Sequence, residues 1–171
     1  AYVQSALDTS QNVQPNMFAP FSIPSLDKVG SLVPTHWGNV DTGAMVNVVY
    51  LGVTRVFKTL QQYWVKYDHV LYGVGGKQTK IVAMLKDVPI RMGCHATREP
   101  DAFSPDTTAP VDFTATFLVV DNDDYHWILG IPLLAGLNGL VHCRDRTLQY
   151  TPPGTTLATT LHLITRTEAK T

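Results

Sequence analysis

One acidic residue occupies a position suited to chemistry, in the stretch GNVDTGAMVNVV at residues 38–49. Asp41 is followed by Thr, Gly and Ala, and apolar runs lie on both sides of this short polar group. An Asp in a tight loop can hydrogen-bond its own backbone, which makes it a turn residue. A carboxylate at the same place can instead move a proton as a general acid or base. The motif alone favours the turn, so the surrounding sequence has to decide between these two interpretations.

Two later stretches change the balance in favour of chemistry. YGVGGKQTKI, at residues 72–81, has three glycines before an alternating strand, as a mobile hairpin requires. WILGIPLL, at residues 127–134, leads from an apolar strand through a glycine into a short helix, and RDRTLQY follows at 144–150. This order of motifs resembles the retroviral-type aspartic proteases (retropepsins), and most closely those of gypsy-type LTR retrotransposons and their host-domesticated relatives. The resemblance covers about residues 30–150.

The resemblance implies a role for each residue that matches a motif. It implies that Asp41 is the catalytic carboxylate and that Thr42 helps to lock two active-site loops together. The glycine and alanine after Thr42 are implied to let the loop pack closely, and the Ile-Leu-Gly triplet to support it. The residues implied to support the active-site loop are Thr42, Gly43, Ala44, Ile128, Leu129 and Gly130, and those implied to form a substrate-binding flap are Tyr72, Gly73, Val74, Gly75 and Gly76.

A single carboxylate does not satisfy the chemistry of an aspartic protease. Two carboxyl groups must share one proton around a water: the ionised one activates the water and the protonated one polarises the scissile carbonyl. The sequence has one Asp-Thr-Gly, because LDTS at residues 7–10 has Ser in place of Gly and no apolar strand after it. We therefore expect the second Asp41 to come from an identical copy, in a homodimer with two-fold symmetry.

The elements that must position Asp41 are mostly short strands. Runs rich in Val, Ile, Thr and Phe predict strands between residue 29 and the C-terminus. Apolar residues at i, i+3, i+4 and i+7 predict a helix over residues 52–64, and Pro132 suits the first turn of a second helix over 130–139. The predicted fold is mostly β, and the resemblance implies a retropepsin-like closed β-barrel with one or two short helices.

Three segments divide the chain. We expect an N-terminal arm or linker over residues 1–28, although its apolar side chains offer a way to dock it on the body. The retropepsin-like domain is expected over 29–153, including a long surface loop at 95–110 that is rich in Pro, Asp and Thr. Residues 154–171 are expected to form a strand or tail, which either enters the dimer interface or covers an edge of its own subunit.

Composition excludes several classes of function. The chain has 171 residues, 44% of them hydrophobic, and a formal net charge of −1 without a Lys/Arg run, so we expect no nucleic-acid partner. No apolar stretch approaches the ~20 residues that span a bilayer, and the start lacks the regions of a signal peptide, so we expect no membrane partner and an intracellular, cytoplasmic location. We expect no cofactor and no metal: Cys94 and Cys143 are expected to be unpaired thiols, and the neighbours Cys94 and His95 would point to opposite faces of a strand.

Two functions follow from these observations. The first is an aspartic endopeptidase that hydrolyses extended polypeptides, as in polyprotein processing, with water as the nucleophile. The alternative is a non-catalytic retropepsin-fold module for dimerisation or peptide binding. The intact sequence from Asp41 to Ala44 argues for the enzyme, whereas the unusual Met45 and the polar Asn39 argue for the module.

Overall fold

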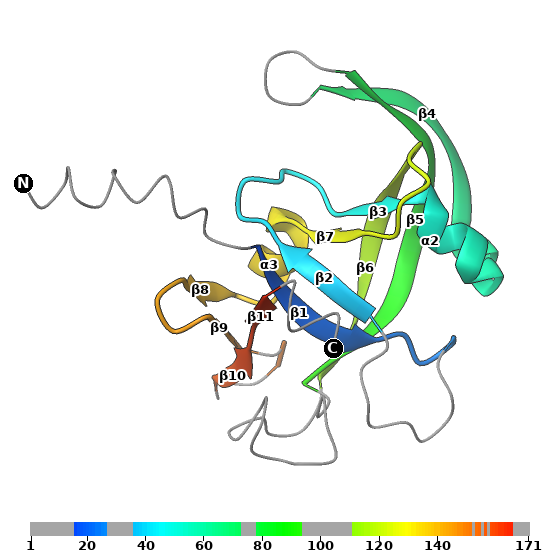
Figure 1. Cartoon of the computed structure of the whole chain (residues 1–171). Helices are drawn as coiled ribbons and strands as arrows, with labels where there is room; N and C mark the ends of the chain where they lie inside the picture. Colours follow the sequence, from blue (N-terminus) through cyan, green and yellow to red (C-terminus); the bar gives the residue numbers. More distant parts are fainter. Residues whose placement is uncertain are drawn as a thin grey trace, which may run out of the picture.

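The computed structural model describes the elements that surround Asp41 (Figure 1). The described residues are 16–26, 36–72, 78–93, 111–151, 153, 154, 156 and 158–165. Their strands are β1 (Met17–Ser22), β2 (His36–Val40), β3 (Val48–Tyr50), β4 (Trp64–Tyr72), β5 (Gln78–Met92), β6 (Val111–Val120), β7 (Trp127–Leu129), β8 (Leu140–His142), β9 (Thr147–Tyr150), β10 (Thr159–His162) and β11 (Ile164–Thr165). Their helices are α2 (Leu51–Val56), the 3₁₀ helix η2 (Lys58–Tyr63) and α3 (Ile131–Gly136).

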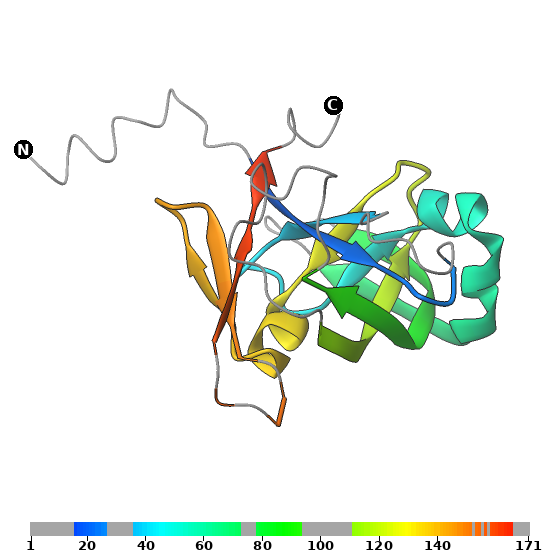
Figure 2. The same ribbon diagram turned by 90° about the horizontal axis from the view of Figure 1, so that it is seen from below.

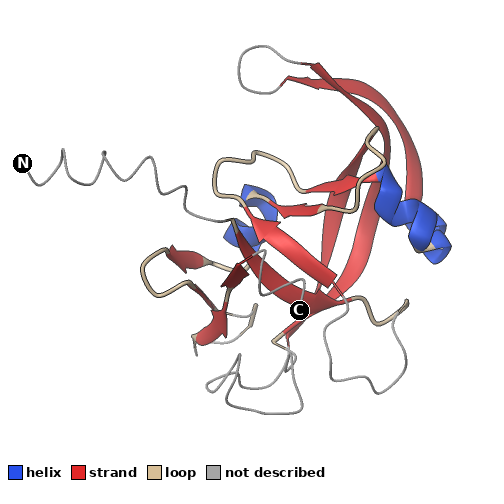
Figure 3. Cartoon of the chain, viewed as in Figure 1, coloured by secondary structure: helices blue, strands red, loops and turns tan. Residues whose placement is uncertain are grey.

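Six strands form a closed barrel, in the order β1, β2, β7, β3, β6 and β5. Figure 3 shows that strands predominate and that the helices are short. β2 runs parallel to β7 and β3 parallel to β6, and the other neighbours are antiparallel. The pairing of Phe21 with Met92 joins β1 to β5 and closes the ring. β4 extends the sheet beyond β5 as a hairpin, and β11 pairs with the first residues of β1, on the edge that β5 joins further along. The predicted mostly β, closed-barrel fold with short helices is therefore confirmed.

The barrel interior is filled by large apolar side chains from opposite walls. Trp127 on β7 is fully buried, and its ring lies edge-on to Phe21 on β1 and Phe117 on β6, with centroids 5.3 and 5.1 Å apart. Edge-to-face aromatic pairs add attraction beyond their burial of apolar surface. β7 is thus anchored deep in the core, next to the strand that leads to Asp41.

The first strand lies in the segment for which we expected an arm or linker. Residues 17–22 form β1 in the barrel wall, and Phe21 and Ile23 are fully buried. The prolines suggested an irregular segment, but Pro20 lies between the residues of β1 that pair with β11 and those that pair with β5, and the apolar side chains are buried. The predicted helix over 52–64 is divided at Phe57 into α2 and η2. The second predicted helix is present as α3.

A second, three-stranded sheet has the order β10-β9-β8 and lies beside the barrel (Figure 2). β10 pairs with β9, so the described part of the tail covers an edge of its own subunit and leaves β8 at the other edge of this sheet. The expected loop at 95–110 lies outside the described residues. Within the part of the chain that the structure describes, no helix has the length and apolar character needed to span a membrane.

Candidate active-site loop

Asp41 lies directly after β2, at the start of a loop that returns to β3 at Val48. Its backbone N–H donates to the Leu129 carbonyl oxygen at 3.0 Å, which ties the beginning of the loop to the end of β7. Its Oδ1 accepts the Gly43 N–H at 2.9 Å, and its carbonyl oxygen accepts the Ala44 N–H at 3.2 Å. The turn interaction and a chemical role are therefore compatible, because the side chain is partly exposed and a carboxylate accepts several hydrogen bonds.

The returning half of the loop is held by the junction between β7 and α3. The Ile131 N–H donates to the Ala44 carbonyl oxygen at 2.8 Å. A Cβ atom on Gly130 would lie 2.8 Å from that same oxygen and closer still to the carbonyl oxygen of Val46. Only glycine fits this close approach of two backbones. The structure thus places Leu129 and Gly130 against the Asp41 loop, and Ile128 lies half-buried between β2 and β3.

A buried amide that the sequence analysis did not single out also contacts this junction. Asn47 ends the loop, is 4% exposed, and accepts the Gly130 N–H on Oδ1 at 2.9 Å. Its Nδ2 donates to the Thr116 carbonyl oxygen on β6 at 3.2 Å. The sequence carries a signal for Asn47, because it is a lone polar residue before the apolar run of β3. That signal does not distinguish a buried amide from a loop residue, because Asn is also common in loops.

Of the residues expected to form a flap, Tyr72 lies in the hairpin of β4 and β5, whose strands extend above the barrel in Figure 1. Tyr72 is the last residue of β4 and pairs with Gln78 at the start of β5. Gly73, Val74, Gly75 and Gly76 lie outside the described residues. The described hairpin is therefore continuous up to the glycine-rich segment.

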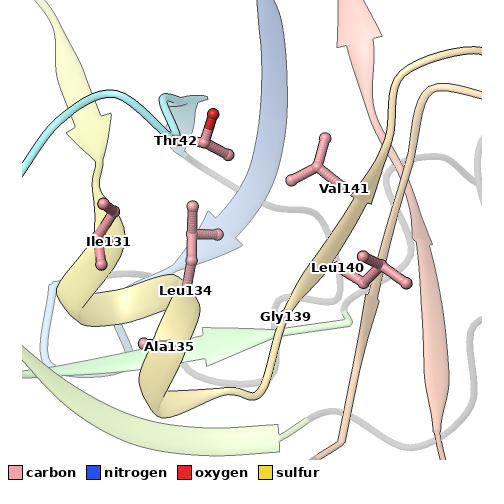
Figure 4. A pocket seen from close by; sticks show the side chains of 7 residues that line it. All are labelled: Thr42, Ile131, Leu134, Ala135, Gly139, Leu140 and Val141. Carbon is pink, nitrogen blue, oxygen red and sulfur yellow. The ribbon is translucent and has the colours of Figure 1, made fainter.

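A hollow of about 420 Å³ is bounded by Thr42 of the Asp41 loop, by α3 and by β8 (Figure 4). Thr42 lies at one side of it, α3 forms the floor with Leu134, and β8 forms the opposite side. The lining is mostly apolar, and Leu140 on the β8 side is 56% exposed. The lining residues are Thr42, Ile131, Leu134, Ala135, Gly139, Leu140 and Val141.

In the described part of the chain, metal-binding side chains do not gather near this loop. Among the described residues, no group of three or more His, Cys, Asp or Glu side chains is arranged to hold a metal ion. Cys143, in the turn between β8 and β9, is an exposed free thiol.

Comparison with known proteins supports the architecture. No family model matches the sequence, and neither does any curated protein. Among solved structures, the chain is similar to the retroviral protease-like domain of Ddi1 from Leishmania major, with a TM-score of 0.55. The match covers 88% of this chain and 95% of that domain, at 13% sequence identity. The fold is retropepsin-like. At this identity the likeness establishes the fold and carries no conclusion about activity, and a retrotransposon origin stays a prediction.

The retropepsin-like barrel presents one Asp41 carboxylate per chain. That carboxylate is half-exposed, and the backbone of its loop is hydrogen-bonded to Leu129 at the start and Ile131 on the return. Such a group can bind and polarise a water, but a single carboxyl cannot serve as the base and the acid of one step. One chain therefore supplies only one of the two carboxyl groups that the chemistry of an aspartic protease requires.

Proposed function

We propose that the protein is an aspartic endopeptidase whose active site is assembled from the Asp41 carboxylates of two identical chains. The observation that carries the proposal is the position of Asp41: a half-exposed carboxylate in an Asp-Thr-Gly-Ala loop that is backbone-bonded to the Leu-Gly junction of a retropepsin-like barrel. Rigid placement is what a catalytic carboxylate requires, because small errors in position reduce the rate strongly.

The chemistry follows from two carboxyl groups that share one proton. The ionised Asp41 takes a proton from a water while the oxygen of that water attacks the scissile carbonyl carbon. The protonated Asp41 of the second copy donates a hydrogen bond to the carbonyl oxygen and then its proton, which gives a neutral gem-diol. Collapse of the diol with protonation of the leaving nitrogen breaks the C–N bond. No covalent intermediate forms, and no cofactor takes part. The substrate we propose is an extended polypeptide, such as a polyprotein, held under the β4–β5 hairpin.

The second copy is proposed to approach the face that carries Thr42. Thr42 is exposed at the side of the apolar hollow, and Leu140 and Ile131 leave large apolar side chains on the same face, 56% and 38% exposed. A two-fold axis beside Thr42 would place each chain's hollow against its partner and bring the two Asp41 loops together. Burial of this apolar face would favour association.

The decisive experiment is cleavage of an unfolded protein substrate at acidic pH, with and without pepstatin. Asp41→Asn preserves the shape of the side chain and removes the acid, so we expect the rate to fall more than about a thousandfold. Asp121→Asn is the matched control, because Asp121 is an exposed acid in the turn between β6 and β7, and it should retain full activity.

Two outcomes contradict the proposal. Cleavage that persists in Asp41→Asn at the wild-type rate would show that another group, or a contaminant, performs it. A wild-type chain that forms dimers but cleaves no substrate would leave the non-catalytic dimerisation or peptide-binding module as the function.

A further inference from the structure

We infer that Asn47 is a positioning residue for Asp41, an inference that rests on the proposed protease function. Asn47 is nearly fully buried and lies six residues after Asp41, at the other end of the same loop. A buried polar side chain destabilises the fold unless it is hydrogen-bonded, so the hydrogen-bond partners of Asn47 indicate its role.

The hydrogen bonds of Asn47 join three separate parts of the barrel. Oδ1 accepts the Gly130 N–H at 2.9 Å, and Nδ2 donates to the Thr116 carbonyl oxygen at 3.2 Å. The backbone of Asn47 adds a third bond, in which its carbonyl oxygen accepts the Leu118 N–H at 2.9 Å. These partners fix the orientation of the amide, because an N–H can only donate and a carbonyl can only accept. A side chain at this site must therefore supply one acceptor and one donor.

The segment that Asn47 holds is the one that supports Asp41. Leu129 accepts the Asp41 N–H, and Ile131 donates to the carbonyl oxygen of Ala44, so two consecutive peptide groups on either side of Gly130 hold both halves of the loop. Asn47 connects Gly130, the middle residue of this segment, to the β6 wall. A shift at Gly130 would pass directly to Asp41 through backbone bonds, without any contact between Asn47 and the substrate.

Two substitutions separate positioning from bulk stability. Asn47→Leu removes both side-chain bonds, and we expect kcat to fall at least about tenfold while KM changes less than about twofold. Thr54→Val is the matched control: Thr54 is also buried and polar, but its hydroxyl bonds to Leu51 within α2. The control should lose some stability and keep its kcat.

Asn47→Asp gives a pH signature that a merely structural role would not produce. A protonated carboxyl can accept from Gly130 and donate to Thr116, as the amide does, whereas a carboxylate has nothing to donate and faces the Thr116 oxygen. Burial also disfavours the charged form. We expect the ratio of the variant's kcat to the wild-type kcat, taken at each pH, to rise at least about fivefold between about pH 7 and about pH 4.5.

Amide hydrogen exchange makes the inference testable whether or not the wild-type chain cleaves a substrate. The amides of Asp41, Gly130 and Ile131 are hydrogen-bonded donors. Their exchange should be at least about tenfold faster in Asn47→Leu than in the wild type, and it should keep the wild-type rate in Thr54→Val. Inactive wild-type protein would overturn the protease function alone. Unchanged exchange at these amides in Asn47→Leu, or a kcat ratio for Asn47→Asp that does not vary with pH, would overturn the role of Asn47.

Discussion

Substitution of Gly130 by Ala tests whether the junction between β7 and α3 supports the Asp41 loop. An added Cβ would lie 2.8 Å from the Ala44 carbonyl oxygen, 2.9 Å from the Val46 carbonyl carbon and closer still to the Val46 oxygen. All three are backbone atoms, so no side chain can rotate away to make room. The loop itself, or the start of α3, has to move.

The size of the effect follows from these contacts. Ordinary contacts of a Cβ begin at 3.4 Å, so the carbonyl of Ala44 must retreat by about 0.6 Å and that of Val46 by more. Overpacking of this kind costs about 1–3 kcal/mol, and the displaced carbonyl of Ala44 also loses the Ile131 N–H, which adds about 1 kcal/mol. We expect the free energy of unfolding of Gly130→Ala to fall by about 2–4 kcal/mol, and kcat to fall about 10- to 100-fold as Asp41 moves.

The assay is urea unfolding combined with peptide cleavage, and the same helix provides the control. Gly136, the last residue of α3, has no atom within 4 Å of an added Cβ and no positive φ. Gly136→Ala should therefore leave the free energy of unfolding unchanged or raise it by up to about 1 kcal/mol, with normal activity. If Gly130→Ala were as stable and as active as Gly136→Ala, the close approach at Gly130 would have no part in supporting the loop.

Two further predictions concern the surface. Arg91 donates to both carboxylate oxygens of Asp112, at 2.7 and 3.0 Å, and this hydrogen bonding holds the pKa of Asp112 below its ordinary value despite an opposing effect of burial. A carboxyl group whose folded-state pKa is lowered stabilises the fold above its unfolded-state pKa, and this stabilisation is lost as the pH falls through the folded-state pKa. In this exposed pair, Asp112→Asn should therefore lower the free energy of unfolding by less than about 1 kcal/mol at pH 7. A difference from wild type that persists unchanged into strong acid would contradict the ion pair. Leu140→Glu should weaken self-association at least about tenfold in sedimentation equilibrium, whereas Val56→Glu, at another exposed apolar residue on α2, should not; equal effects would exclude the hollow as the dimer face.

The sequence predicted the architecture because several independent signals agreed. Alternating residues along β5 and β6 have the period of a strand, and the structure buries them in that alternation. The Ile-Leu-Gly-x-Pro pattern predicted a strand, a sharp turn and a short helix, which are present as β7, Gly130 and α3. Each element is local, so its pattern can be read without knowledge of its partners.

The sequence did not predict how distant segments pair. β1 is spatially beside β2 and β5, but its prolines and the polar residues around it gave it the composition of a linker. Burial of Phe21 against Trp127 outweighs that local preference, and this contact spans more than 100 residues of sequence. The helix over 52–64 was predicted as one piece because the pattern of apolar residues continues across Phe57. The backbone is not helical at that residue.

The difference between Asp41 and Asn47 shows what a motif contains and what it omits. Asp41 is recognisable because the chemistry proposed for it requires one residue type in one short sequence, and a loop of small residues follows from that requirement. Asn47 acts through partners on β6 and at Gly130, 69 and 83 residues away, so no local pattern specifies it. An amide suits this position because the backbone of Gly130 offers a donor and the backbone of Thr116 offers an acceptor. The support of a catalytic residue is therefore a property of the folded barrel, and it is found by following the hydrogen bonds of buried polar side chains.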